Sequence, residues 1–204
     1  MIITARHDEA GLHFLAGEPE EYDAQPRYSG LVLTHWPQET SESRMALAKI
    51  LAFWFEASTR VRTAPDSLHP ATAELVERTR EYWVPSIHVQ YAARNIPTGG
   101  LTVDLRRSHE PEHDGGDVSL VVHPTGDFTG HYATLREHHI GSNSFLFDDL
   151  APAHGSLMDL ATALIFGDDL KMGRLLMTRP SGDSIIVAAL PDMLRSVGIR
   201  LEWS

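Results

Sequence analysis

The chain has 204 residues, of which 42% are hydrophobic and 22% charged, and its formal net charge is −11. These values are typical of one globular domain that buries its own core, so we expect a single domain over residues 1–204. The negative charge disfavours phosphate backbones and anionic lipids as partners, and we expect neither nucleic acid nor membrane binding.

The sequence contains no cysteine. This excludes disulfides, thiolate nucleophiles and cysteine-ligated zinc or iron–sulfur centres. The start of the chain has no basic-then-apolar signal pattern, and the longest apolar stretch, 45–55, is interrupted by Lys49 and too short to cross a bilayer. We therefore expect a cytoplasmic protein. The preference for arginine over lysine is typical of a GC-rich bacterial genome.

The first half of the chain predicts a hairpin, a buried strand and two helices. Alternation around a turn-like tetrapeptide indicates the hairpin, and apolar residues at helical spacing indicate the helices. Thr40 or Ser41 caps the first helix, and Pro70 suits the first turn of the second. The predicted segments are strands 2–6 and 12–16, strand 31–35, a helix from 40 or 41 to about 55, and a helix from about 70 to 84.

In the middle of the chain, apolar and polar side chains alternate with a period of two residues. Residues 86–92, 101–106 and 117–123 each alternate apolar with polar side chains, which predicts three strands with one buried and one polar face. Glycine pairs at 99–100 and 115–116 separate these segments. We interpret the three strands as an antiparallel meander.

The last part of the chain mixes strands and helices. The predicted segments are an irregular stretch 124–153 with one strand at 145–147, a helix from about Ser156, a strand, a turn at 180–183, a strand at 185–189, a short helix from Pro191 and a strand at 199–203. Because strict strand–helix alternation is missing, we predict an α+β fold, an antiparallel or mixed β-sheet backed by three to four helices.

Histidines concentrate in one stretch, since six of the twelve lie between residues 109 and 139. His123, Asp127 and His131 supply two imidazoles and a carboxylate, the ligand set of a facial metal triad, and glycines between them let the loop turn. We predict these three residues as ligands of a divalent metal. We also predict them, with His138, as catalytic residues: His123 or His131 as the base, Asp127 to orient it or bind metal, and His138 as acid or third ligand.

A secondary site follows from the expected meander. Matching the polar faces aligns His88 with Arg106 and Arg106 with Asp117, about 5 Å apart, so the three residues are secondary candidates. The next row contains Asp104 and Ser119. A carboxylate beside an imidazole raises its pKa and fixes its tautomer, which suits a general base.

Two further histidines, His109 and His113, have the four-residue spacing of helical zinc ligands. Pro111 and the following glycines argue against a helix, so we expect a solvated hairpin loop there. A strand about 20 Å long would separate this loop from His123.

The pattern favours a small-molecule enzyme of bacterial metabolism that uses histidine and carboxylate acid–base chemistry, of the lyase, dehydratase or isomerase type, with or without a metal. No phosphate loop or nucleophile elbow is present, so no nucleotide cofactor is expected. The alternative is a non-catalytic accessory subunit of a larger biosynthetic assembly. The partner is then a small-molecule substrate or another protein, and a homo-oligomer remains an open alternative. The enzyme predicts a concave pocket lined by at least two of the candidate catalytic histidines, whereas the accessory subunit predicts a large apolar patch and no enclosed pocket.

Overall fold

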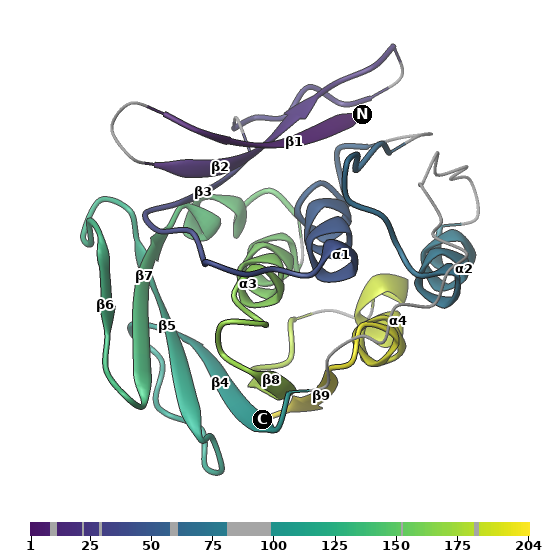
Figure 1. Ribbon diagram of the computed structural model, residues 1–204. Coiled ribbons are helices and arrows are strands. Elements are labelled where there is room, and N and C mark those ends of the chain that lie inside the picture. The colour runs from purple at the N-terminus through teal and green to yellow at the C-terminus, as the bar shows by residue number, and fades with distance from the viewer. Residues whose placement is uncertain are drawn as a thin grey trace.

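The computed structural model describes residues 1–8, 12–21, 23–28, 30–57, 61–80, 99–151, 153–181 and 184–204. Within them, nine strands form one mixed sheet in the order β1-β2-β3-β7-β5-β4-β8-β9, with β6 paired to β7, and four α-helices gather on one face (Figure 1). This confirms the predicted α+β class with a mixed sheet backed by helices.

The elements have the following bounds. The strands are β1 (Ile2–His7), β2 (His13–Glu18), β3 (Gly30–Leu33), β4 (Leu101–Arg107), β5 (Val118–Pro124), β6 (His131–Ala133), β7 (Glu137–Ser142), β8 (Met172–Met177) and β9 (Arg200–Trp203). The helices are α1 (Glu42–Ala52), α2 (Pro70–Thr79), α3 (His154–Ile165) and α4 (Ile185–Ser196), with a short 3-10 helix η1 (Ser144–Phe147).

The N-terminal strands form an antiparallel unit. β1 and β2 pair from Ile2 opposite Glu18 to His7 opposite His13, as the predicted hairpin requires, and β3 pairs with β2. A single residue pair, Leu33 with Ser142, joins β3 to β7.

Of the other six strands, β7, β5, β4, β8 and β9 run parallel, and β6 pairs antiparallel with β7. The predicted meander is therefore wrong: β4 and β5 are parallel, and Arg106 lies opposite Val121 instead of Asp117. The physical reason is that an alternation of period two reads the same in either strand direction. The predicted strand 86–92, with His88, lies outside the described residues.

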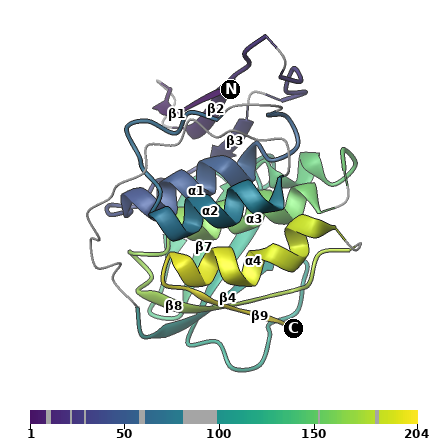
Figure 2. The same cartoon turned by 90° about the vertical axis from the view of Figure 1, so that its right-hand side faces the viewer.

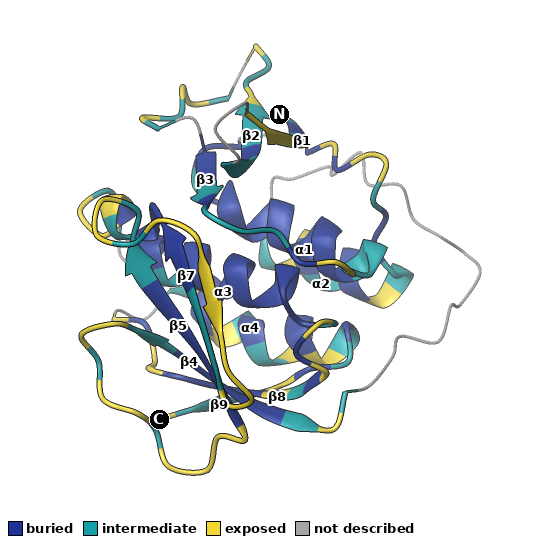
Figure 3. Cartoon of the chain, turned by 60° about the vertical axis from the view of Figure 1, so that its left-hand side comes forward, coloured by how far each residue is buried: buried dark blue, intermediate teal, exposed yellow. Residues whose placement is uncertain are grey.

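Helices cover one face of the sheet in two tiers. α3 contacts β4 and α4 contacts β9, while α1 packs on α3 and α2 packs on α4 (Figure 2). Because α3 lies between the sheet and α1, its side chains are buried on nearly all sides (Figure 3). Among the described residues, no helix is long and apolar enough to cross a membrane.

Three segments differ from prediction. Residues 145–147 lie in the 3-10 helix η1, and the stretch 124–153 contains β6 and β7. The predicted strand 185–189 and short helix from Pro191 are one helix, α4. Ser184 caps this helix, accepting a hydrogen bond from the Val187 amide at 3.4 Å, and only one face of its apolar run is buried. A short apolar run alone does not distinguish strand from helix.

Candidate functional site

The three predicted catalytic histidines separate onto two faces of the sheet, and Asp127 lies in the turn after β5. Successive residues of a strand point to opposite faces, so His138 and His139 of β7 diverge. On the open face, His123 Nε2 lies 2.9 Å from His139 Nδ1. On the helix-covered face, His131 stacks on His35 with ring centroids 4.0 Å apart, and the His138 ring lies 5.8 Å from that of His131.

The predicted metal triad is not assembled. Among the described residues, which include His123, Asp127 and His131, no three histidine, aspartate or glutamate side chains are arranged to hold a metal ion. The His123 ring stacks on Phe128, with centroids 4.7 Å apart, and turns toward His139. Burial lowers the pKa of His123, His139 lowers it further, and the nearby negative charge of Asp127 opposes this.

The histidines on the helix-covered face favour the neutral form. Burial lowers the pKa of His35, His131 and His138, neighbouring imidazoles lower each further, and Asp169 opposes the shift in all three. The Asp169 carboxylate already accepts hydrogen bonds from the backbone amides of Gln38 and Glu39, at 2.8 and 3.0 Å. Within the described residues, no carboxylate is hydrogen-bonded to any of these three rings.

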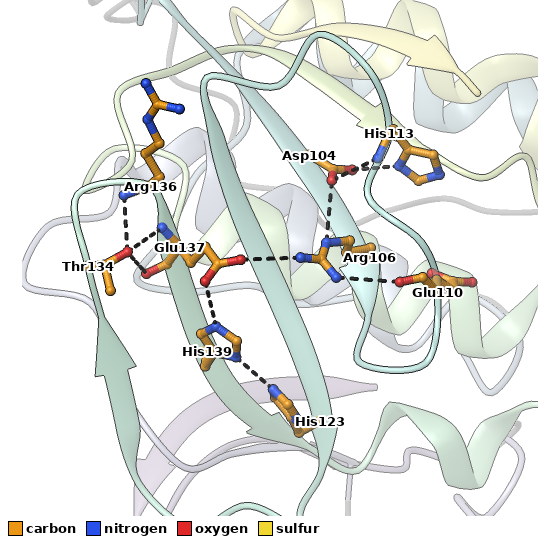
Figure 4. A network of polar contacts seen from close by, with 9 residues as sticks. All are labelled: Asp104, Arg106, Glu110, His113, His123, Thr134, Arg136, Glu137 and His139. Carbon is orange, nitrogen blue, oxygen red and sulfur yellow. Dashed lines mark hydrogen bonds and ion pairs between the residues drawn. The ribbon is translucent and has the colours of Figure 1, made fainter.

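A different histidine acquires a carboxylate partner on the open face. The loop 108–117 between β4 and β5 passes over Asp104, which is fully buried, and places His113 Nδ1 2.5 Å from Asp104 Oδ1 (Figure 4). The His113 amide donates to Asp104 Oδ2 at 3.2 Å. Gly116 permits this close path, because a Cβ there would lie 2.9 Å from the Asp104 Cβ.

The second nitrogen of His113 faces a hydroxyl group. An ionised Asp104 only accepts hydrogen bonds, so the proton of the neutral imidazole is assigned to Nδ1 and the lone pair to Nε2. His113 Nε2 lies 3.3 Å from Thr178 Oγ1, just beyond the end of β8. Asp104, His113 and Thr178 thus form a chain of carboxylate, imidazole and hydroxyl. In this order the carboxylate orients the imidazole, and the imidazole can take a proton from a hydroxyl group or from a bound molecule.

Charged residues continue this contact across the open face. Arg106 Nε lies 3.5 Å from Asp104 Oδ2, and Arg106 Nη2 lies 3.4 Å from Glu137 Oε1. Glu137 Oε2 is 3.5 Å from His139 Nε2, which connects the network to His123 (Figure 4). Arg106 is therefore part of the site.

The remaining secondary candidate, Asp117, lies at the other end of the strands. Its Oδ2 accepts a hydrogen bond from the Thr102 amide at 2.8 Å near the start of β4. The parallel pairing carries it away from Arg106, and it takes no part in the network.

A cavity of about 270 Å³ opens at the carboxyl ends of β4 and β8. β4 lies between β5 and β8, so the chain continues from β4 to one side of the sheet and later adds β8 on the other side. Such switch points in parallel sheets are common ligand sites. Thr178 lies on the cavity wall and so joins His113 to it. The lining residues are Leu105, Arg106, Arg107, Glu110, Ser156, Asp159, Met177, Thr178, Arg179, Pro180 and Ser181.

A larger hollow of about 730 Å³ lies at the opposite ends of the same strands, where Gly99 and Lys171 contribute to its wall. Its described lining contains the ion pair of Arg44 with Asp168, 2.9 Å apart. Neither cavity has a histidine among its described lining residues, but Thr178 on the wall of the smaller one lies 3.3 Å from His113 Nε2. The smaller cavity is therefore the better candidate for acid–base chemistry.

Sequence reasoning missed His113 and Thr178. The expected hairpin left His113 in solvent, and no motif marks Thr178. One part of the site was predictable from the sequence. The alternation aligned Asp104 with Ser119, and these two residues are partners in the observed pairing of β4 with β5.

Comparison with known proteins identifies no relative. No protein-family model, curated protein or solved structure matches this chain. The functional argument therefore rests on the geometry of the site.

Proposed function

We propose that this chain is a cytoplasmic enzyme that moves protons on a small molecule, with His113 as the general base. One observation carries the proposal: a buried carboxylate holds an imidazole whose second nitrogen faces a hydroxyl on the wall of a cavity. A general base needs a fixed orientation, a defined tautomer and access to substrate. The contact with Asp104 supports the first two, and the contact with Thr178, a lining residue, brings Nε2 next to the cavity.

In the proposed reaction, His113 Nε2 removes a proton from a substrate carbon or oxygen held beside Thr178. The Thr178 hydroxyl positions that group, and Asp104 stabilises the imidazolium that forms. The imidazolium then returns the proton to a leaving group or to a different carbon of the same substrate, which gives elimination or isomerisation. Removing one member of such a charge-stabilised set lowers rates by about 10²–10⁴-fold in other enzymes.

The cavity is concave, as a small-molecule site requires, but none of the histidines chosen from the sequence is among its described lining residues. The lyase, dehydratase and isomerase classes remain the best matches because each needs a positioned acid–base group and no nucleotide.

Deuterium exchange tests the proposal without knowledge of the final product. The protein is incubated in D₂O with a panel of small hydroxy, keto and amino acids and sugar phosphates, and carbon-bound deuterium is measured by NMR. We expect exchange on at least one compound, and a rate about 10²–10⁴-fold lower in His113→Ala.

The matched control is His131→Ala, which removes an imidazole on the opposite face of the sheet. It should leave the exchange rate unchanged. Exchange that proceeds at the wild-type rate in His113→Ala contradicts the proposal.

A further inference from the structure

The cavity beside His113 is lined by three arginines and two carboxylates in a chain whose net charge is −11. Two of the arginines are committed to protein partners. Arg107 donates to both Asp148 oxygens, at 2.5 and 2.9 Å, and to Asp159 at 2.7 Å. Arg106 contacts Asp104, Glu137 and the Glu110 carbonyl.

The two carboxylates of the lining are occupied as well. Glu110 Oε2 accepts a hydrogen bond from the Arg107 amide at 2.8 Å, and Asp159 pairs with the Arg107 side chain. Burial raises the pKa of Asp159, against the opposing effect of Arg107, and so weakens its negative charge. The other Asp159 oxygen, Oδ1, is buried and makes no hydrogen bond in the described part of the chain.

Arg179 is the arginine left over. It lies two residues after the end of β8, is exposed, and makes no hydrogen bond or ion pair in the part of the chain that the structure describes. The side chains of Ser156 and Ser181, also on the wall, make no hydrogen bonds there either. A guanidinium and two hydroxyl groups therefore face the cavity with their donors available.

We infer that this cavity binds a small molecule through a carboxylate or phosphate group, held by Arg179 with the hydroxyls of Ser156 and Ser181. A guanidinium forms paired hydrogen bonds with the oxygens of either anion. Ser156 belongs to the first turn of α3, where the helix dipole also favours negative charge. The volume of about 270 Å³ is below the range for drug-sized ligands, so the ligand has only a few carbons.

The inference deepens the proposed function and rests on it for the reacting end of the ligand. Arg179 follows Thr178 in sequence, and both line the same cavity. An acid anchored at Arg179 therefore presents a hydrogen on a carbon near its anionic group to the Thr178 and His113 side. Neutralising the anion with a guanidinium makes such a hydrogen more acidic, which assists its removal.

Calorimetric titration of the full chain with lactate, succinate and inorganic phosphate, at an ionic strength held constant with sodium chloride, tests the anion site. We expect wild-type binding in the millimolar range or tighter, and about tenfold or greater weakening in Arg179→Gln. The order of the three affinities identifies a carboxylate or a phosphate as the preferred group.

The control is Arg195→Gln, which makes the same charge change on the exposed face of α4, where Arg195 is 70% exposed and outside the cavity. It should bind like the wild type. Equal weakening in both variants, or a wild type that binds none of the three anions at millimolar concentration, overturns the inference.

The outcomes also separate the two proposals. His113→Ala should keep the anion affinity while losing deuterium exchange. Intact exchange without anion binding overturns the anion site alone, whereas anion binding without any exchange overturns the proposed function alone.

Discussion

Two of the histidine–carboxylate pairs in the described residues differ in their surroundings. His113 and Asp104 form a 2.5 Å hydrogen bond at the edge of a cavity. His154 Nε2 lies 3.3 Å from Glu56 Oε1, but neither nitrogen of its ring makes a hydrogen bond. The His154 ring packs against aromatic side chains, with its centroid 4.8 Å from that of Phe147.

This difference in surroundings changes the charge of the second pair. Burial lowers the pKa of His154 to about 4 and raises the pKa of Glu56 to about 7. Both groups are therefore neutral between these values, and both side chains are buried. An imidazole and a carboxylate thus form a hydrogen-bonded pair next to a cavity in one region and a buried neutral pair in another, and the contact of His113 Nε2 with the lining residue Thr178 distinguishes the first pair.

The largest effect that we expect is on the pH dependence of the free energy of unfolding. In Glu56→Gln, His154 remains with a folded pKa below its ordinary 6.5, so the unfolded chain binds the proton first. Its contribution is present above pH 6.5 and is lost as the pH falls toward about 4. We expect the free energy of unfolding to decrease by about 3 kcal/mol over that range.

The complementary variant should have the opposite slope. In His154→Phe, Glu56 remains with a folded pKa above its ordinary 4.5, so its contribution is present below pH 4.5 and is lost as the pH rises through about 7. The decrease is again about 3 kcal/mol. Subtracting the urea-unfolding curves of the two variants removes the background of other carboxylates.

If the free energy of unfolding changed with pH in the same direction in both variants, this account of the buried pair of His154 and Glu56 would be wrong. A large loss of deuterium exchange in either variant, measured where it is folded, would instead remove the distinction between the two pairs.

A smaller effect is expected at the loop that covers Asp104. Gly116→Ala brings a methyl group to 2.9 Å from the Asp104 Cβ and pushes the loop with His113 away. We expect a destabilisation of about 1–3 kcal/mol and slower deuterium exchange. Urea unfolding and the exchange assay measure the two effects.

Gly126→Ala serves as the matched control, because a Cβ at Gly126 meets nothing within 4 Å. Its stability should stay within about 0.5 kcal/mol of the wild type. If Gly116→Ala is equally mild, the loop does not hold His113 through close packing on Asp104.

Local features of the fold were predictable because they depend on neighbouring residues. The hairpin of β1 and β2 follows from alternation around a turn, and Pro70 marks the start of α2. The positions of β4 and β5 also follow from alternation, but their relative direction does not. Direction depends on the path of the connecting chain, which period-two alternation does not encode.

The candidate site depended on that missing information. His123 and His131 were grouped because they are close in sequence. In the structure, His123 contacts His139 and His131 lies beside His138, and these two consecutive residues of the unpredicted strand β7 point to opposite faces of the sheet. His113 was assigned to solvent because an antiparallel hairpin would carry it beyond the sheet. Only the parallel return of the chain brings it over Asp104.

The handedness of the chain explains that return. The connection from β8 to β9 runs through α4 on the helix-covered face, whereas the connection from β4 to β5 moves in the opposite direction across the sheet. Two parallel crossovers that move in opposite directions have the same hand only if they pass on opposite faces, and nearly all such crossovers are right-handed. The loop 108–117 therefore belongs on the open face, and the contact of His113 with Asp104 follows from the chirality of the polypeptide before any attraction between the two side chains is considered.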